Sequence, residues 1–187
     1  MNHAVADVMA FMRIAGQPVR SSPEIPQDPE GAADPVLRLA VAELGALARA
    51  LKGHASSEKA FRLRLILSEA AELATALVEN DLAGVADALA DLDYVTIGTA
   101  VQFGIPHGAV WDAVQASNLA KFPVCDTCYG GLERAGDGGE RLCSLCHGTG
   151  RIVVKDAQGK VQKPAGWAPP DIAAILTNAV VEPQERS

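Results

Sequence analysis

Aromatic residues, positive charge and long apolar runs are all scarce in this sequence of 187 residues. The formal net charge is −7, which argues against a general nucleic-acid-binding surface, because such a surface needs an excess of Lys and Arg. No apolar run reaches the roughly 18 residues that span a bilayer. The N-terminal residues lack the basic and apolar segments of a secretion signal. We therefore expect a cytoplasmic protein without a membrane segment.

Aromatic side chains make up only 4% of the chain, and alanine dominates the apolar residues that are present. Hydrophobic residues account for 49% of the chain, and 33 of them are Ala. Alanine is the best helix former and a poor strand former, so this composition favours closely packed helices over a β-sandwich. The length suits one domain of ordinary size and an appendage.

Apolar residues at helical spacing predict helices over residues 3–15, 35–52, 58–79, 82–103, 107–120 and 172–178. Five prolines from Pro18 to Pro35 predict an extended connection over 17–35. Only Asn80 and Asp81 separate the third and fourth helices, which should therefore be antiparallel neighbours. The expected fold is all-α: an antiparallel helical bundle with a small inserted zinc ribbon and a short C-terminal extended segment.

The same pattern predicts how the chain divides into parts. Residues 1–121 should form the helical domain, and residues 122–150, rich in Gly and short of large apolar side chains, should form the insertion. Residues 151–180 should pack back on the helical domain, with a strand at 151–155 and a turn at Gln158 and Gly159. Residues 181–187 are expected to be disordered.

Two pairs of acidic residues lie on the third and fourth predicted helices. Glu69 and Glu72 are three residues apart, and Asp87 and Asp91 are four apart, so each pair shares one helix face. Carboxylates that point into a bundle need partners, and hard divalent cations are the usual ones. The alternative is two solvated acidic faces, since charged residues are mostly exposed. The apolar neighbours expected to be buried are Leu63, Ile66, Ala70, Leu73, Leu77, Leu89, Leu92, Val95 and Ile97.

All four cysteines lie in one short region, as two C-x-x-C knuckles separated by 14 residues. Four thiolates at this spacing predict a closed structural zinc site, with four unliganded cysteines or a redox pair as the alternatives. Gly130 and Gly148 follow the two knuckles at the same offset, and their tight turns need positive φ. The second knuckle resembles one repeat of the DnaJ-type zinc module. The expected zinc ligands are Cys125, Cys128, Cys143 and Cys146.

The segments around both acidic pairs resemble the all-α nucleotide pyrophosphohydrolases. These are the MazG-like proteins, related to phosphoribosyl-ATP pyrophosphohydrolase and the dimeric dUTPases. The similarity covers most of residues 5–121 and 151–176, and the run from Ala116 to Lys121 is similar to that of a phage and bacterial branch. It implies hydrolysis of a nucleoside triphosphate between its α- and β-phosphates, giving a monophosphate and pyrophosphate. A homodimer or homotetramer is expected, because apolar surface on the helix pair should be buried against another copy.

The resemblance also implies a role for each site residue. Magnesium or manganese would be held by carboxylates, would neutralise phosphate oxygens and would lower the pKa of the attacking water, whose proton Glu69 could take. Asn118, Lys121 and Arg62 would bind the phosphates, with Arg62 equally well explained as a solvated helix cation. The implied metal ligands and catalytic residues are Glu69, Glu72, Asp87 and Asp91.

The sequence departs from the family pattern at two positions. Ser68 stands where the first motif, Glu-Glu-x-x-Glu, has its first Glu, and Ala88 stands at the Glu of the second motif. Asp87 is the only nearby replacement for the second of these, and it lies about 40° around the helix from Asp91. These departures leave open a catalytically inactive helical scaffold, on which the zinc ribbon would bind protein or nucleic acid.

Overall fold

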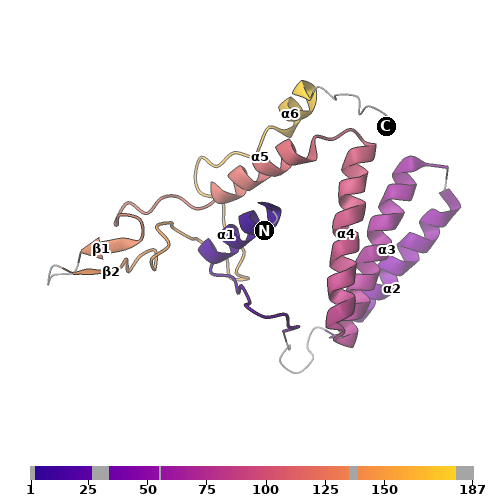
Figure 1. Cartoon of the computed structure of the whole chain (residues 1–187), viewed down its shortest axis with the longest axis horizontal. Helices are drawn as coiled ribbons and strands as arrows, with labels where there is room; N and C mark the ends of the chain where they lie inside the picture. The colour runs from indigo at the N-terminus through magenta and orange to yellow at the C-terminus, as the bar shows by residue number, and fades with distance from the viewer. Residues whose placement is uncertain (1–2, 27–33, 55, 135–138, 180–187) are drawn as a thin grey trace. The chain divides into compact units, whose positions relative to one another are not determined.

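The structure is a computed structural model that describes residues 3–26, 34–54, 56–134 and 139–179 (Figure 1). The chain divides into two compact units. The first unit holds residues 1–19 and 108–180, and the second holds residues 20–107 and 181–187. In the described part of the chain, no helix is long and apolar enough to cross a membrane.

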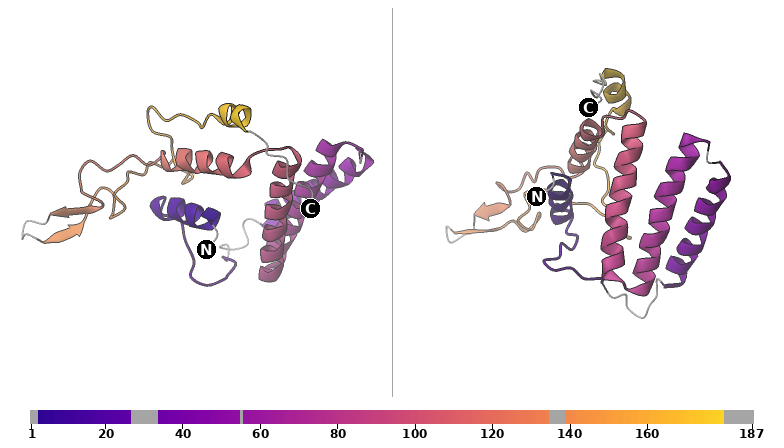
Figure 2. Two further views of the ribbon diagram at one scale, coloured as in Figure 1. Left: turned by 45° about the horizontal axis from the view of Figure 1, so that its top comes forward. Right: turned by 45° about the vertical axis from the view of Figure 1, so that its right-hand side comes forward.

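The second unit is a layer of three helices, α2 (Asp34–Leu51), α3 (Glu58–Glu79) and α4 (Leu82–Gln102). A short 3₁₀ turn, Lys52–His54, follows α2. Helix α3 lies in the middle and packs against α2 on one side and α4 on the other, as Figure 2 shows most clearly in its right-hand view. The three helices come in the expected order, and their bounds lie within one residue of those expected from the sequence.

Local signals in the sequence set the ends of α3 and the start of α4. The Ser57 hydroxyl accepts a hydrogen bond from the Ala60 N–H, which caps the start of α3. Asn80 ends α3 in the left-handed conformation, with φ of 54°, which Asn tolerates better than most residues. The Asp81 N–H then donates to the Ala76 carbonyl. The reversal takes two residues, so α3 and α4 are forced to run antiparallel side by side.

Small residues fill the seams between these helices. A Cβ atom added to Gly84 on α4 would lie 3.1 Å from the Cβ of Ala76 on α3, so the two backbones approach closely. Close approach is what the alanine-rich composition predicts, because small side chains let helix axes come near each other. The buried residues of the layer are Ala48, Ala74, Ala76, Ala88 and Ala100.

Three large side chains expected in the core are exposed instead. Leu63, Leu89 and Ile97 expose 49%, 50% and 47% of their surface. A single layer of three helices has two faces, and the described residues of this unit do not cover both of them. The expectation of burial was therefore wrong for these residues. The other six apolar neighbours that were expected to be buried are half-buried: Ile66, Ala70, Leu73, Leu77, Leu92 and Val95.

The first unit contains α1 (His3–Ile14), α6 (Ile172–Asn178) and nearly all of α5 (His107–Leu119). Asp7 on α1 joins two residues of α5: its carboxylate accepts from the Trp111 indole N–H at 2.8 Å, and its carbonyl oxygen accepts from the Gln115 amide at 2.9 Å. The Phe11 ring packs at 5.0 Å from the ring of Phe122, which is 1% exposed. These contacts hold α1 against α5 and the residues that follow it.

The cysteine module, residues 122–150, contains a two-stranded antiparallel hairpin of β1 (Leu132–Arg134) and β2 (Glu140–Leu142). The strand expected at 151–155 does not form. Its two ends make single bridges to different segments, Arg151 to Val124 and Lys155 to Val161, so no continuous ladder develops. The turn expected after it is present, with Gly159 at a φ of 82°.

The C-terminal segment is tied to α5 within the same unit. The Trp167 indole N–H donates to the Ser117 carbonyl at 2.9 Å, and the Arg151 guanidinium donates to the Phe122 carbonyl at 3.1 Å. The all-α class with a small cysteine-bearing insertion is confirmed. The expected domain boundaries stay a prediction, and the expected disorder of residues 181–187 lies outside the described residues.

Candidate active site and metal centre

The four carboxylates of the predicted site lie across the α3–α4 hairpin and act on one another. Burial is the largest effect that raises the pKa of Glu69 above its ordinary value, followed by the charges of Glu72, Asp91 and Asp87. Glu69 is half-buried, whereas the other three are exposed. Charges influence a pKa in this way only at short range, so residues from both helices share one acidic face. We call Glu69, Glu72, Asp87 and Asp91 the acidic face.

A cavity of about 240 Å³ opens at the turn end of the same hairpin. Its floor is made of the small residues Ala76, Gly84 and Ala88, which leave room between the helices. Its acidic lining extends the predicted site by two residues that sequence reasoning missed, Glu79 and Asp81. The signal for Glu79 was present, since it lies two helical turns after Glu72 and so on the same face. The acidic lining residues are Glu72, Glu79, Asp81 and Asp87.

Position 88 is one of the two departures from the family pattern. Ala88 is 4% exposed and lines the cavity together with the adjacent Asp87. That Asp87 replaces the carboxylate missing at position 88 stays a prediction. Ser68 is half-buried on α3, and nothing in the structure explains its presence at the other position.

The spacing of the acidic face differs from that of a closed metal site. Among the described residues, the four cysteines are the only set of three or more ligand residues whose donor atoms all lie within 4.8 Å of one another. The carboxylates are more widely spread. Mutual repulsion of four like charges on an accessible surface favours such spreading, and a divalent cation would offset it.

The three predicted phosphate-binding residues lie in different units. Arg62 on α3 donates through Nε to Gln102 on α4, so it bridges the hairpin two turns before Glu69. Asn118 and Lys121 belong to the unit of α5, where the Lys121 ammonium donates to the Asn118 side-chain oxygen at 2.7 Å. The same ammonium lies 5.9 Å from the centre of the Phe11 ring. Asn118 and Lys121 are therefore brought together as a pair.

The four cysteine sulfurs gather as a zinc site requires. Cys125 and Cys143 have their sulfurs 3.9 Å apart, and Cys128 and Cys146 have theirs 3.5 Å apart. Tetrahedral zinc with bonds of about 2.3 Å holds neighbouring sulfurs about 3.8 Å apart. All except Cys128 are buried. The geometry is compatible with zinc and leaves no open position for substrate.

Glycines bring the two knuckles into backbone contact. Gly130 and Gly148 have φ angles of 62° and 86°, as the tight turns predict. Gly131, with φ of 100°, lies so close to the second knuckle that an added Cβ atom would stand 2.2 Å from the Gly148 carbonyl oxygen. No other residue type fits there.

Backbone N–H groups in these turns stabilise thiolate. Burial raises the pKa of Cys146, but hydrogen bonds from Cys128 and from the Gly150 backbone outweigh it and lower that pKa to about 7. Burial and hydrogen bonds with Cys125 and Cys146 raise the pKa of Cys128 to about 12. Cys146 is therefore the first thiol of this pair to ionise, and thiolate is the form that binds metal.

The acidic face lies in the segment that matches a known family. Residues 47–118 match the family described as phosphoribosyl-ATP pyrophosphohydrolase. This segment contains the acidic face, Arg62 and Asn118, and it ends before Lys121 and the cysteines. The predicted resemblance is confirmed for this part of the chain.

The fold matches one solved structure described as that of a "putative NTP pyrophosphohydrolase" from Exiguobacterium sp. 255-15. The alignment covers 94% of each chain with a TM-score of 0.50 and 22% sequence identity, so the likeness is one of fold. No curated protein sequence matches the chain.

Replacing Gly131 by alanine should release zinc, because the new Cβ would strike the Gly148 carbonyl. Gly130→Ala is the matched control, since Gly130 also has positive φ but nothing lies within 4 Å of its added Cβ. Metal analysis of the purified proteins should give about one zinc per chain for the unaltered protein and for Gly130→Ala. The zinc content of Gly131→Ala should fall toward that of Cys143→Ser, which lacks one of the four expected ligands. The helical circular dichroism of Gly131→Ala should be largely kept. Equal zinc in both glycine variants would contradict the proposed contact.

Glu69→Gln should stabilise the fold in the absence of added divalent cations. The folded-state pKa of Glu69 is raised, so its ionised form costs stability, and this cost appears as pH rises through that pKa. Thermal unfolding should give Glu69→Gln a higher midpoint than the unaltered protein at neutral pH, with the gap closing toward pH 4. Glu43→Gln, a neutralisation on α2, should show no such gain. A lower midpoint for Glu69→Gln at neutral pH would contradict a raised pKa of Glu69 in the folded protein.

Proposed function

We propose that this protein is a metal-dependent nucleoside triphosphate pyrophosphohydrolase acting in the cytoplasm. It would cleave between the α- and β-phosphates to give a nucleoside monophosphate and pyrophosphate. The observation that supports this most is the acidic face: the pKa of Glu69 is raised first by burial and then by the charges of Glu72, Asp91 and Asp87, which come from both antiparallel helices. The match of the surrounding segment to the phosphoribosyl-ATP pyrophosphohydrolase family supports the reaction class.

Magnesium or manganese fits the donor set of the acidic face. Carboxylate oxygens are the ligands that these hard cations prefer, and the face lies beside an open cavity that a substrate can enter. We assign the metal to Glu69, Glu72, Asp87 and Asp91. When bound, the cation would supply charge neutralisation for the phosphate oxygens and a lower pKa for the attacking water.

The side chains divide the remaining roles. Burial and the neighbouring carboxylates raise the pKa of Glu69 above its ordinary value, which makes this carboxylate a better proton acceptor than an exposed one. The side-chain oxygen of Asn118 accepts from Lys121, so its amide N–H groups stay available to donate to a phosphate. Lys121 and Arg62 would add positive charge at the triphosphate.

We also propose that the protein is a homodimer or homotetramer, because apolar side chains stay uncovered on α4. Tyr94, Ile97 and Val101 share one helix face and expose 80%, 47% and 69% of their surface. Light scattering of the unaltered protein should give a mass of two or four chains. Ile97→Glu should lower it, whereas Thr96→Glu is the control for added charge, because Thr96 is exposed on the same helix but lies about 100° or more around it from these three residues. A monomeric mass for the unaltered protein at micromolar concentration would disprove the assembly.

A panel of deoxy- and ribonucleoside triphosphates, including modified bases, tests the reaction. With magnesium or manganese, we expect pyrophosphate release from at least one nucleotide, and the panel then gives the base and sugar preference. Glu72→Gln should reduce turnover by more than about 100-fold, because it removes a metal ligand. Glu43→Gln, away from the acidic face, should keep full activity.

Absence of turnover with either metal would reject this function. It would favour the alternative, in which the helices are an inactive scaffold and the cysteine module binds a protein or a nucleic acid. The departures at Ser68 and Ala88 are the features that make this alternative worth testing.

A further inference from the structure

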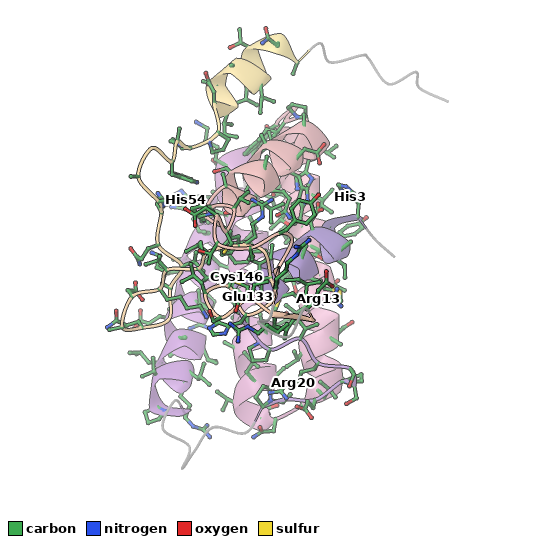
Figure 3. All side chains as sticks on the ribbon, turned by 90° about the vertical axis from the view of Figure 1, so that its left-hand side faces the viewer. His3, Arg13, Arg20, His54, Glu133 and Cys146 are labelled. Carbon is green, nitrogen blue, oxygen red and sulfur yellow. The ribbon has the colours of Figure 1, made fainter. Side chains whose placement is uncertain are left out.

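A second cavity, of about 370 Å³, lies within the unit that holds the cysteine module. One side is the end of α1, with Arg13 and Gly16, and the opposite side is the second knuckle, with Cys146 and His147. Arg13 and Cys146 are labelled in Figure 3, which shows them on α1 and on the knuckle. The segment after the knuckle completes the wall with Arg151 and Lys155. We call this the basic cavity.

The charge of the basic cavity is opposite to that of the whole chain. Arg13, Arg151 and Lys155 give it a formal charge of +3, and no carboxylate of the described residues lines it, although the chain carries −7. In the part of the chain that the structure describes, the side chains of Arg13 and Lys155 have no acidic partner within 4 Å. Three cations around one hollow repel each other, so an anion from solvent would bind favourably.

Two internal charges compete as partners for these cations. The end of α1 carries the negative pole of the helix dipole, about half a charge. Backbone N–H groups of Gly16 and Gln17 already bind the Arg13 and Met12 carbonyls there. A zinc ion with four thiolates carries two negative charges, but the buried Cys146 sulfur already receives backbone N–H groups of Gly148 and Gly150. Both internal charges have local partners, which leaves the cations to face the cavity.

We propose that the basic cavity binds a compact phosphate anion, either inorganic pyrophosphate or the phosphate groups of a free nucleotide. Arginine forks match phosphate oxygens in pairs, and lysine adds a point charge. The cavity has the size of a small-molecule site, and its cations surround one hollow instead of forming a stripe, so it fits a compact ligand better than a duplex.

Gly16 ends α1 beside one of the three cations. It has φ of 62°, and an added Cβ atom would lie 3.8 Å from the Lys155 ammonium. The hydroxyl of Thr149 is already used, because it donates to the Cys146 and Arg151 carbonyls. Recognition is therefore assigned to Arg13, Lys155 and Arg151, whose guanidinium donates one of its five N–H groups to the Phe122 carbonyl and keeps the others for the ligand. This site needs no divalent cation and does not depend on the proposed hydrolysis.

Isothermal titration calorimetry of the zinc-loaded full chain with pyrophosphate, without added magnesium or manganese, tests the proposal. Under these conditions the acidic face repels phosphate, so binding reports on basic sites. We expect binding that weakens as salt is added. The double variant Arg13→Gln with Lys155→Gln should bind at least tenfold more weakly, while Lys160→Gln, an exposed lysine outside the cavity, should bind like the unaltered protein.

Parallel titrations distinguish the sources of phosphate. Inorganic phosphate, pyrophosphate, a deoxynucleoside triphosphate and a single-stranded oligonucleotide are compared, and we expect pyrophosphate or the triphosphate to bind most tightly. Preference for the oligonucleotide would overturn the proposal in favour of nucleic acid. Absence of pyrophosphate binding at millimolar concentration, or equal binding by the double variant, would also overturn it. If the double variant loses zinc but binds pyrophosphate as tightly as the unaltered protein, the two cations stabilise the zinc thiolates and the proposal is overturned.

Lysine labelling gives a second test on the unaltered protein and does not require any variant to fold. Acetic anhydride should modify both Lys155 and Lys160, and pyrophosphate should protect Lys155 while leaving Lys160 reactive. Mass spectrometry of peptides measures both sites in one sample. Equal labelling of Lys155 with and without pyrophosphate would place any bound phosphate elsewhere.

Discussion

Electrostatic repulsion among carboxylates at the α3–α4 hairpin is the constraint on which the proposed chemistry depends. The helices cannot separate to relieve it, because a two-residue turn at Asn80 and Asp81 joins them and a seam of small residues holds them close. The pKa of Glu69 is raised first by burial and then by the charges of the other three carboxylates, so the repulsion adds to the cost of ionising Glu69. A divalent cation would lower the free energy of this arrangement by offsetting the repulsion. The phosphate oxygens of a triphosphate would bind the same cation.

The cysteine module is stabilised in a different way, because it has few large apolar side chains with which to form a core. Its hairpin strands have three residues each, and its buried side chains are chiefly the cysteines themselves. Backbone contact between Gly131 and Gly148 replaces side-chain packing, and N–H groups aimed at sulfur favour the thiolate that zinc requires. The module is thus specified by positive φ angles and ligand spacing, and hydrophobic burial contributes little to it.

Helix positions could be predicted from the sequence because local signals decide them. Ser57, Asn80 and the apolar spacing gave the bounds of α3 and the start of α4. The gathering of the four cysteine sulfurs could also be predicted, because each C-x-x-C knuckle is a local signal. Burial was harder to predict: Leu63, Leu89 and Ile97 are apolar and correctly placed on their helices, yet exposure depends on what covers the layer, which no local pattern contains. The prediction of a strand at 151–155 was wrong, because strand pairing depends on partners elsewhere in the chain. Here each end of the segment pairs with a different partner, Arg151 with Val124 and Lys155 with Val161.

The basic cavity was missed for a related physical reason. Arg13, Arg151 and Lys155 are ordinary surface cations in the sequence, with no spacing that links residue 13 to residue 151, and only the docking of α1 beside the knuckle gathers them. Net charge conceals this arrangement, since −7 overall is compatible with a local +3. The sign of each cavity then fixes what it can bind: the acidic one can bind phosphate only together with a cation, whereas the basic one attracts phosphate directly. Removing divalent cations should therefore separate the two sites, since it abolishes phosphate binding at the acidic face and leaves the electrostatics of the basic cavity unchanged.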